Sequence, residues 1–526
     1  MAGFDVLTEP WIPVIALDGS QRELGIIDAL ADAHKLSEVI CESPLETYAV
    51  QRFLITFLMD AYRLPHAGDR RRLFESKCFD KNVIKKYVAL CRSEGVTFDL
   101  FDKEKPFYQA VFDERYDSEA KTKPSAILLH AVPSGNSPVH FDHFGISECS
   151  PAQAFRALLA AQIYATAMAQ GYPSSVNDTP CWYVLIKGNS LFETLCLSML
   201  SVGECRGMEF DSGLPAWRDK SVEIPKAEHA DISVLEGLTF RPRRITLVRD
   251  TDGKVRQLYY QQGQSFHQNG RWIDPHVSFF VNKNGEYVSV KPRLGRMAWR
   301  DVGAFALSNA DNMSRPATII TASEGIIEKH IPRLIMLFGL VSSQAKYEDW
   351  LYDEINIPGD ILLDEDKADA LRMTMERIEQ TAALVYTTVN SVSYAMEHKE
   401  DSKKKQSEPA KEAEKAFFCE MLIVDGKKKQ SEAAREAEEA FFSEMHTALF
   451  AEYFPVLAKA NTSSADWMRT TNEVINNCIK KTAWQTTYEF VKKIGSTAKY
   501  LEAQTIILRY FRTKLSTILY GRKADG

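Results

Sequence analysis

An apolar run in the second half of the chain constrains its fold most. Residues Leu334 to Val341 are all apolar when Gly339 is included, and the short polar segment Ser342 to Ala345 follows them. An unbroken apolar run of this length is typical of a buried strand or of the end of a buried helix. The sequence therefore predicts a buried element that carries a small, uncharged, polar tip. Taken alone, such a tip is most simply an ordinary surface loop.

The sequence changes character at Asp364, where a helical pattern begins. Apolar residues from Leu371 to Met396 follow an unbroken 4-3-4-3 spacing, which is typical of a helix packed in a bundle. We predict an α+β chain, with a mixed α/β domain containing β-hairpins over residues 1–363 and a four-helix bundle over residues 364–526. Residues 403–421 and 427–445 are nearly identical. We interpret this 403–445 repeat as a tandem duplication that leaves one copy in the second bundle helix.

Composition and motifs exclude several classes of protein. The chain is 45% hydrophobic and 26% charged, as in globular proteins, and no apolar run reaches the ~18 residues of a membrane span. Its nine cysteines include no C-x-x-C pair, so we expect reduced thiols, a cytoplasmic location and no zinc site. No phosphate-binding loop, zinc-protease motif or convincing triad is present, and we expect neither an enzyme nor a cofactor.

Positive charge is concentrated between Phe240 and Arg300. This segment has nine Arg and three Lys against four acidic residues, a net charge of +8 in a chain of net charge −7. Such a segment is typical of a phosphate-binding surface, although a solvated face of a β-hairpin gives the same pattern. We predict that four of its arginines contact the phosphate backbone of DNA: Arg241, Arg243, Arg244 and Arg256. Three turn dipeptides, Asp252-Gly253, Asn269-Gly270 and Asn284-Gly285, predict hairpins here.

Seven short motifs together resemble one family. In order they are FDVLTEPWIPV (Phe4 to Val14), KPFYQ (Lys105 to Gln109), PSGNSPVHFDH (Pro133 to His143), GNSLFETL (Gly188 to Leu195), DPHVSF (Asp274 to Phe279), AWRD (Ala298 to Asp301), and Arg333 with the run that ends in Gln344-Ala345-Lys346. They resemble the CasA family, the large subunit of the type I-E CRISPR Cascade complex. The resemblance implies a subunit that recognises a short duplex motif, the PAM, opens the duplex and recruits a helicase–nuclease.

The resemblance also implies which residues touch nucleic acid. Gln344 is the wedge that enters the duplex, with Ser343 and Ala345 against the minor groove. A loop that is glycine-rich in the family retains only Gly171 here, so Ser174, Ser175 and Asn177 would reach DNA by side chain. The family's minor-groove lysine has no counterpart at Gln264 to His267, and Lys254 or Arg271 would compensate.

The implied partners are nucleic acids and the other subunits of Cascade. They are the guide crRNA, double-stranded target DNA, the backbone subunits, the subunit that caps the 5′ handle, the small subunits and the recruited helicase–nuclease, with no membrane. The loop between Ile127 and Gly145 would approach the guide and the target entry site through Asn136 and Phe141.

Two other readings remain open from the sequence. His140, Asp142 and His143 are metal-ligand types, with Asp274 and His276 as further candidates, and a metal-dependent nuclease is the alternative function. A Pro/Gly-containing loop gives little reason for three ligands to converge on one point. The third reading, a helical scaffold without a nucleic-acid role, does not account for the basic segment.

Overall fold

The computed structural model divides the chain into two compact units. It describes residues 3–111, 113, 122–128, 148–167, 171–177, 181–219, 227–282, 284–306, 314–343, 346–397, 431–494 and 498–521. One unit is Met1–Leu363 and the other is Asp364–Gly526, so the chain divides where the bundle-like spacing begins. Within the described residues, no helix combines the length and the apolar character that crossing a membrane requires.

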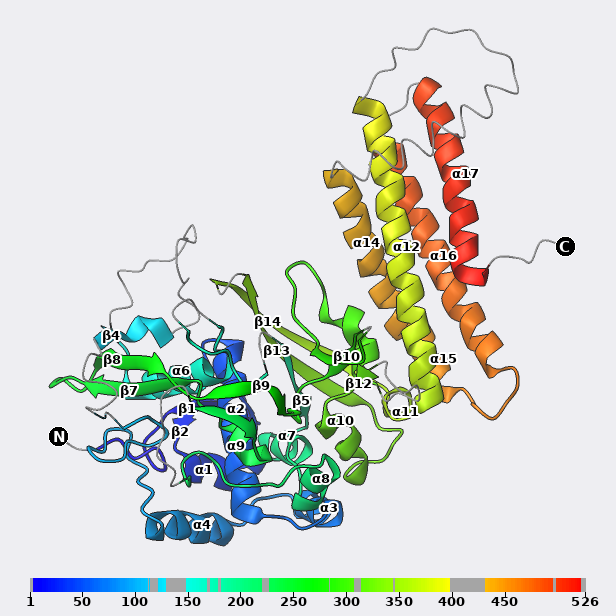
Figure 1. The fold of residues 1–526 in the computed structure, drawn as a ribbon. Helices are drawn as coiled ribbons and strands as arrows, with labels where there is room; N and C mark the ends of the chain where they lie inside the picture. Colours follow the sequence, from blue (N-terminus) through cyan, green and yellow to red (C-terminus); the bar gives the residue numbers. More distant parts are fainter. Residues whose placement is uncertain are drawn as a thin grey trace. The chain divides into compact units, whose positions relative to one another are not determined.

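The first unit is built around a buried helix, α2 (Pro44–Tyr62) (Figure 1). As its sequence indicates, Pro44 begins the helix and the Ser43 hydroxyl caps it by accepting from the Glu46 backbone N–H at 3.2 Å. Four helices pack on α2: α4 (Lys81–Ser93), α6 (Pro151–Ile163), α7 (Leu191–Ser198) and α9 (Val234–Leu238). The other helices of this unit are α1 (Ile26–Ala31), α3 (Ala67–Glu75), α8 (Val202–Gly207), α10 (Thr318–Ala322) and α11 (Gly359–Leu362), with 3₁₀ turns at Ala33–Lys35, Ser125–Leu128, Ala298–Ala304 and Ser323–Gly325.

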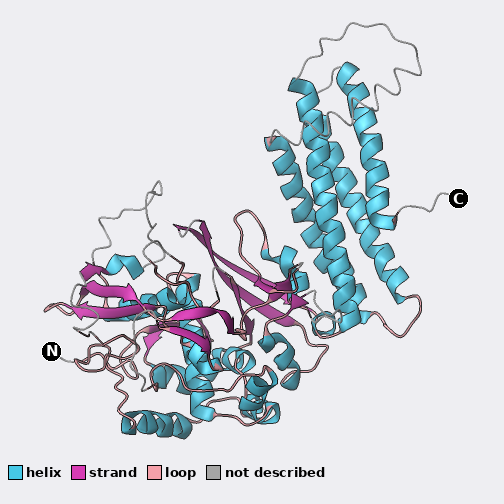
Figure 2. Ribbon diagram, viewed as in Figure 1, coloured by secondary structure: helices cyan, strands magenta, loops and turns pink. Residues whose placement is uncertain are grey.

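The strands form several small sheets, confirming the mixed α/β prediction (Figure 2). Three sheets have the orders β2-β1-β3, β11-β10-β12 and β4-β8-β7, formed by β1 (Ile12–Ala16), β2 (Gln21–Leu24), β3 (Leu36–Val39), β4 (Thr122–Pro124), β7 (Arg243–Arg249), β8 (Val255–Gln262), β10 (Phe279–Val281), β11 (Tyr287–Ser289) and β12 (Ser314–Arg315). The other two are β14-β13-β5 and the parallel pair β6-β9, formed by β5 (Trp182–Lys187), β6 (Glu228–Asp231), β9 (Ser265–Arg271), β13 (Arg333–Ser343) and β14 (Lys346–Ile357).

Two of the three predicted hairpin turns exist. Gly253 connects β7 to β8 with φ +86°, and Gly285 connects β10 to β11 with φ +81°. The prediction of a turn at Asn269-Gly270 is wrong, because both residues lie inside β9. Pairing of β9 with β6, which is distant in the sequence, overrides the local turn signal there.

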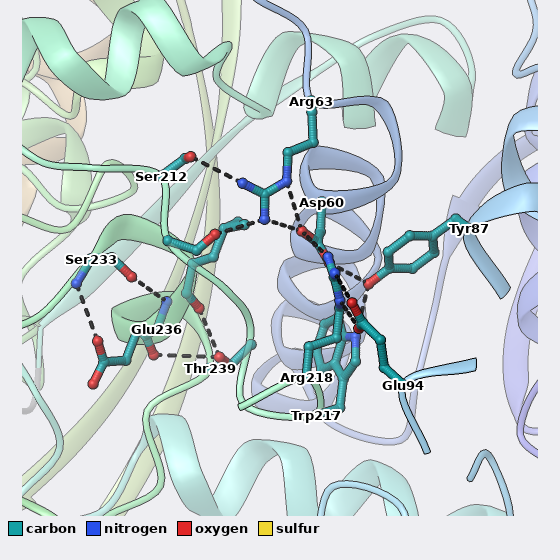
Figure 3. Close-up of polar contacts among 12 residues, drawn as sticks. Asp60, Arg63, Tyr87, Glu94, Ser212, Trp217, Arg218, Ser233, Glu236 and Thr239 are labelled. Carbon is teal, nitrogen blue, oxygen red and sulfur yellow. Dashed lines mark hydrogen bonds and ion pairs between the residues drawn. The ribbon is translucent and has the colours of Figure 1, made fainter. Parts of the chain in front are cut away.

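A buried carboxylate fixes the C-terminal end of α2. Asp60 accepts from the Arg218 guanidinium at 2.9 and 3.1 Å, from the Tyr87 hydroxyl at 2.6 Å and from Arg63 Nε at 2.9 Å (Figure 3). Arg218 also donates twice to Glu94, at 2.7 Å each. Burial, and then the nearby charge of Asp60, holds the pKa of Tyr87 well above its ordinary value, so this hydroxyl stays a donor.

The second unit is the predicted four-helix bundle. Helix α12 (Glu365–Glu397) packs against α14 (Glu432–Ala448), α16 (Trp467–Ile494) and α17 (Ala498–Tyr520). A π-helical turn, Leu449–Tyr453, joins α14 to the short α15 (Phe454–Lys459). The second copy of the 403–445 repeat supplies most of α14, as expected, and the first copy lies outside the described residues.

Candidate nucleic-acid interface

The apolar run from Leu334 to Val341 lies in strand β13, which forms a long hairpin with β14. β5 pairs with β13 only from Leu334 to Gly339, whereas β14 pairs with it as far as Ser343, which lies opposite Lys346. Beyond Gly339 the hairpin therefore continues past β5 as a two-stranded arm. Gln344 and Ala345 separate the last pair in the sequence and lie outside the described residues. The predicted roles of Ser343, Gln344 and Ala345 stay predictions.

The arm is anchored where it leaves the sheet. A Cβ on Gly339 would lie 2.8 Å from the Trp182 ring and 2.9 Å from Pro292, so only glycine allows these side chains to cover the strand. On the other strand, burial raises the pKa of Tyr347 to about 12. Tyr260 and Arg243 of the β7–β8 hairpin change that pKa by smaller amounts. The half-buried Tyr347 side chain therefore lies near the β7–β8 hairpin.

The loop that the resemblance assigns to the minor groove borders a pocket. Gly171 has φ +78°, a left-handed conformation that favours glycine. Pro173 to Asn177 then line a pocket of about 600 Å³, which is also lined by Ser265, Phe266, His267, Trp272, Phe279, Tyr287, Val288, Ser289 and Lys291. Ser174 is half-buried and Ser175 is buried. Buried Val176 packs beneath the loop with Ile232 and Phe240.

The loop begins where α6 ends. The sequence predicts α6 to continue to about Gln170, but it stops at Ile163. The carbonyl of Ala165 instead accepts from the Ser175 backbone N–H at 2.8 Å, and that of Thr166 accepts from Arg243 at 2.7 Å. These carbonyls accept hydrogen bonds from the loop and from Arg243 and not from a further helical turn, so the helix ends before them.

Asn177 is held from inside the protein. Its amide donates to Asp274 at 2.8 Å and to the Tyr183 hydroxyl at 3.2 Å, and its side-chain oxygen accepts from the Trp272 indole at 2.9 Å. Asp274 also pairs with Arg52 at 2.7 Å. The prediction that the Asn177 side chain reaches DNA is therefore wrong, because all of its hydrogen-bonding atoms are used to position the loop.

His276 belongs to the same network and is neutral. Its Nε2 lies 2.9 Å from the Ser198 carbonyl and its Nδ1 lies 3.0 Å from the Tyr48 hydroxyl. A carbonyl only accepts, so Nε2 carries the proton and Nδ1 accepts from Tyr48. Burial lowers the pKa of His276 to about 4. Burial acts to raise the pKa of Asp274, but Arg52, His276 and Asn177 outweigh it and hold that pKa below its ordinary value.

These contacts exclude Asp274 and His276 from the metal site of the alternative nuclease function. The side chains of Asp274 and His276 are buried and hydrogen-bonded within this network, so they do not face an accessible metal site. Within the described parts of the chain, no three His, Cys, Asp or Glu side chains come together as metal ligands. His140, Asp142 and His143 lie outside the described residues, as do Asn136 and Phe141.

Arg243 is a structural residue, and the prediction that it contacts phosphate is wrong. The side chain is 1% exposed. Its guanidinium donates to Tyr260 Oη at 2.8 Å and to the carbonyls of Thr166 at 2.7 Å and Pro173 at 2.5 Å. It thus binds the start of the loop, at Thr166, and its middle, at Pro173, to the β7–β8 hairpin.

The other arginines of the basic segment differ from one another. Arg244 is buried and donates to the Val111 carbonyl at 3.0 Å, so its predicted phosphate contact is also wrong. Arg256 is paired with Asp250, Asp252 and Glu148 at 2.5 to 2.8 Å, so its charge is offset within the protein, contrary to the prediction. Arg241 is half-buried at a pocket beside Gln109, and its role stays a prediction.

Neither proposed substitute for the family's lysine is shown at the loop. Lys254 lies in the β7–β8 turn, 3.7 Å from Glu148. Gly171 lies near Gln262 at the other end of β8, and eight residues of strand span roughly 26 Å, so Lys254 is far from the loop. Arg271 ends β9 opposite Asp231, and its role stays a prediction.

Residues that line the pocket were missed by the sequence interpretation. Lys291 is exposed and Tyr287 is 53% exposed. Tyr287 and Ser289 alternate along β11, and Lys291 follows two residues after that strand ends, so this spacing of two was the available signal. It places a lysine opposite the Gly171 loop that neither Lys254 nor the Gln264 to His267 segment provides.

Comparisons with known proteins agree with the fold and the motif series. The family model described as CRISPR-associated protein Cse1 matches residues 5–483. The CRISPR-associated protein CasA/Cse1 of Thermus thermophilus is 28% identical over 404 residues, which are 71% of this chain and 75% of that protein.

Solved structures resemble the whole chain. The crystal structure of Cse1 from Acidimicrobium ferrooxidans matches with a TM-score of 0.73 at 20% identity and covers 99% of each chain. A chain of a structure described as a CRISPR RNA-guided surveillance complex matches with a TM-score of 0.69 at 18% identity and covers 98% of this chain and 100% of that one. At these sequence identities the similarity to solved structures shows the fold, and the match to the family model shows the family membership. The chain belongs to the Cse1 family of CRISPR-associated proteins.

Proposed function

We propose that the chain is the large subunit of a cytoplasmic type I-E CRISPR RNA-guided surveillance complex, Cascade. Family membership and the likeness to a chain of a CRISPR RNA-guided surveillance complex support this. The subunit recognises the PAM in double-stranded DNA through the minor groove, opens the duplex for pairing with the guide RNA, and recruits the helicase–nuclease. It binds and positions nucleic acid and leaves cleavage to the recruited protein, so it is itself not an enzyme.

One observation carries the duplex-opening part of the proposal. Arg243 binds the Gly171 loop by its contacts to Thr166 and Pro173, and Tyr347 of the hairpin arm lies near the same arginine. The arm thus starts close to the residue that fixes the loop. A wedge must push on one base step while another element holds the duplex still, and two elements that lie this close can act on the same end of a duplex.

The pocket beside the loop has suitable chemistry for the minor groove. That groove presents mainly acceptors with a degenerate pattern, so hydroxyl donors and one cation give coarse recognition. Ser174 and the exposed Lys291 supply these groups in this chain. Lys291, rather than Lys254, is therefore the cation that we assign to the duplex.

Binding by the assembled complex tests this assignment. Complex reconstituted with guide RNA and the partner subunits is titrated with a library of target duplexes randomised beside the target, which also identifies the PAM. Lys291→Gln should weaken duplex binding several-fold and reduce the log–log salt slope by about 0.9, the value for one phosphate contact. Lys254→Gln is the matched control, because that lysine lies in the same basic segment but faces Glu148. Equal effects of the two substitutions would contradict the assignment.

A further inference from the structure

The 403–445 repeat supplies two sequences for one helix of the bundle. The second copy forms most of α14, which packs against α12 and α16. Within the repeat the buried residues of α14 are Ala434, Ala437, Phe441, Phe442 and Met445, and the first copy has the same residue types at the corresponding positions, Ala410, Ala413, Phe417, Phe418 and Met421. Ser431 caps α14 with its side chain, and Ser407 corresponds to it. The first copy thus has the apolar face and the cap that this place in the bundle requires.

The two copies differ at positions that α14 does not bury. The differing pairs, with the first copy given first, are Pro409 and Ala433, Lys411 and Arg435, Lys415 and Glu439, and Cys419 and Ser443. Arg435, Glu439 and Ser443 are exposed, and Ala433 is half-buried. Ala433 lies in the first turn of α14, where a backbone N–H has no partner within the helix, so proline is accepted there. The differences therefore leave the buried face of the helix unchanged.

The residues that follow each copy favour the second one. Ala448 and Leu449 are buried, and Leu449 begins the π-helical turn that leads to α15. Val424 corresponds to Ala448 and is also apolar, but Asp425 corresponds to Leu449. An unpaired carboxylate at the buried Leu449 position would be strongly unfavourable. The first copy can therefore fill the place of α14 as far as Ala448 and no further.

The chain is long enough for the first copy to reach this place. The hydroxyl of Ser431, at the start of α14, lies 3.2 Å from that of Ser393 in α12. Ser393 lies about one turn, roughly 6 Å, before Glu397, where α12 ends. The residues between Glu397 and Ser407, numbers 398–406, can span up to about 30 Å. A link from Glu397 to a Ser407 placed beside Ser393 is therefore unstrained.

We propose that residues 407–424 can replace residues 431–448 in the bundle of the same chain, so that the place of α14 has two alternative occupants. In the second arrangement residues 425–448 leave the bundle as a loop, and Leu449 keeps its position. The exchange moves a long connection from one end of the helix to the other. Closure entropy depends only weakly on loop length, so this move changes the free energy little.

The exposed face of the helix differs between the two arrangements. Lys415 takes the place of Glu439, which makes the helix more positive by two charges. Apolar residues take two exposed positions, Leu422 that of His446 and Ile423 that of Thr447. The exchange therefore presents a less acidic and more apolar surface. Exposure of these apolar side chains also favours the second copy as the main occupant.

Two deletions of equal length test whether each copy can serve as the helix. Deletion of residues 425–448 joins Val424 to Leu449 and leaves only the first copy, whereas deletion of residues 403–426 leaves only the second. Both chains should keep the helical circular dichroism of the bundle, with equilibrium constants of urea unfolding within about 10-fold of each other. Loss of the bundle in the first deletion alone would overturn the proposal.

Competition between two thiols for a third measures the exchange in the full-length chain. The chain carries Ser393→Cys, Ser407→Cys and Ser431→Cys, with Cys419→Ser, and is equilibrated in a glutathione redox buffer. The short distance between the Ser393 and Ser431 hydroxyls suits a disulfide. Peptide mass spectrometry gives the ratio of the 393–407 disulfide to the 393–431 disulfide. We expect the 393–431 disulfide to dominate. The 393–407 disulfide should exceed several-fold the 393–408 disulfide of a control with Glu408→Cys in place of Ser407→Cys, because Glu408 corresponds to the exposed Glu432.

Matched core substitutions separate exchange from random collision. Phe441→Ala removes a buried ring from the second copy only and should raise the ratio by about 100-fold or more. Adding Phe417→Ala to that chain should reverse the rise, whereas a rise caused by unfolding would persist. A ratio that ignores both substitutions would overturn the proposal. A 393–407 disulfide found only between two chains would also contradict it, since the occupant would then be a second copy of the protein.

Discussion

Arg243 holds Pro173 from inside the protein, by a hydrogen bond of 2.5 Å from its guanidinium to the Pro173 carbonyl. The same guanidinium reaches the Thr166 carbonyl and the Tyr260 hydroxyl, so one buried side chain fixes three segments. The local sequence, RPRR at Arg241 to Arg244, has the composition of a phosphate-binding patch. Its second arginine instead connects the loop that borders the candidate interface to the hairpin beneath it.

This contact predicts that Arg243→Lys is a stability variant. Lysine keeps the charge but has no planar fork that can bond several carbonyls at once, and a buried ammonium would be left with unpaired donors. We expect the free energy of unfolding to fall by about 3 kcal/mol, within the range for breaking buried charged hydrogen-bond networks. Urea denaturation measures this fall.

The exposed Arg256 provides the control. Arg256→Gln should change stability by less than about 1 kcal/mol, because exposed ion pairs contribute little. Neither substitution should change the log–log salt slope of DNA binding, since neither arginine offers a free charge to phosphate. A lowered slope for Arg243→Lys in folded protein would show that Arg243 does contact the DNA backbone.

The carboxylate at the end of α2 leads to a second prediction. Arg218 and Arg63 both pair with Asp60, but the Arg218 side chain is 9% exposed and that of Arg63 is 36% exposed. Arg218→Gln leaves Asp60 and Glu94 without their shared buried partner and should lower the free energy of unfolding by about 3 kcal/mol. Arg63→Gln, nearer to solvent, should lower it by about 1 kcal/mol. Urea denaturation that gives the opposite order would refute this description of the network in Figure 3.

His276 predicts how stability depends on pH. Its folded pKa of about 4 lies below the ordinary value of 6.5, so the unfolded chain binds this proton more readily. The stabilisation is complete above pH 6.5 and is lost as the pH falls towards 4. Between pH 7 and pH 5 this histidine alone should remove roughly 2 kcal/mol.

His276→Gln isolates this contribution, because glutamine can hydrogen-bond to Tyr48 and Ser198 but does not titrate. The variant should lose roughly 2 kcal/mol less than the wild-type protein when denaturation is measured at pH 7 and at pH 5. The buried Glu46 acts in the opposite direction, since burial raises its pKa to about 7, but it is present in both proteins and cancels in the difference. Parallel pH profiles would show that His276 is not buried in its neutral form.

Local signals in the sequence were sufficient where a few neighbouring residues determine the structure. Ser43 and Pro44 define the start of α2, and the run from Leu334 to Val341 is a buried strand, one of the two elements that the sequence left open. The bundle follows from the 4-3-4-3 spacing, because buried residues of α12 such as Leu371 and Val389 fall on that spacing.

The features that the sequence did not predict depend on contacts between residues that are far apart in the chain. Asn269-Gly270 forms no turn because β9 pairs with β6, and Asn177 does not reach outward because Asp274, far along the chain, binds it. Counting charges also failed for Arg243 and Arg256, since a net charge says nothing of burial or of pairing with Asp250 and Glu148.

The central claim, that the tip of the β13–β14 arm opens the duplex, is tested by one comparison. Binding of reconstituted complex carrying Gln344→Ala is measured on a closed target duplex and on a duplex of the same sequence already unpaired beside the PAM. Unstacking a base step costs a few kcal/mol, so loss of the wedge should weaken binding to the closed duplex and leave binding to the open one nearly unchanged. Gln257→Ala, at an exposed position of β8, should change neither. Equal weakening on both duplexes would make Gln344 a recognition contact, and no change on either would contradict a role for the tip in strand opening.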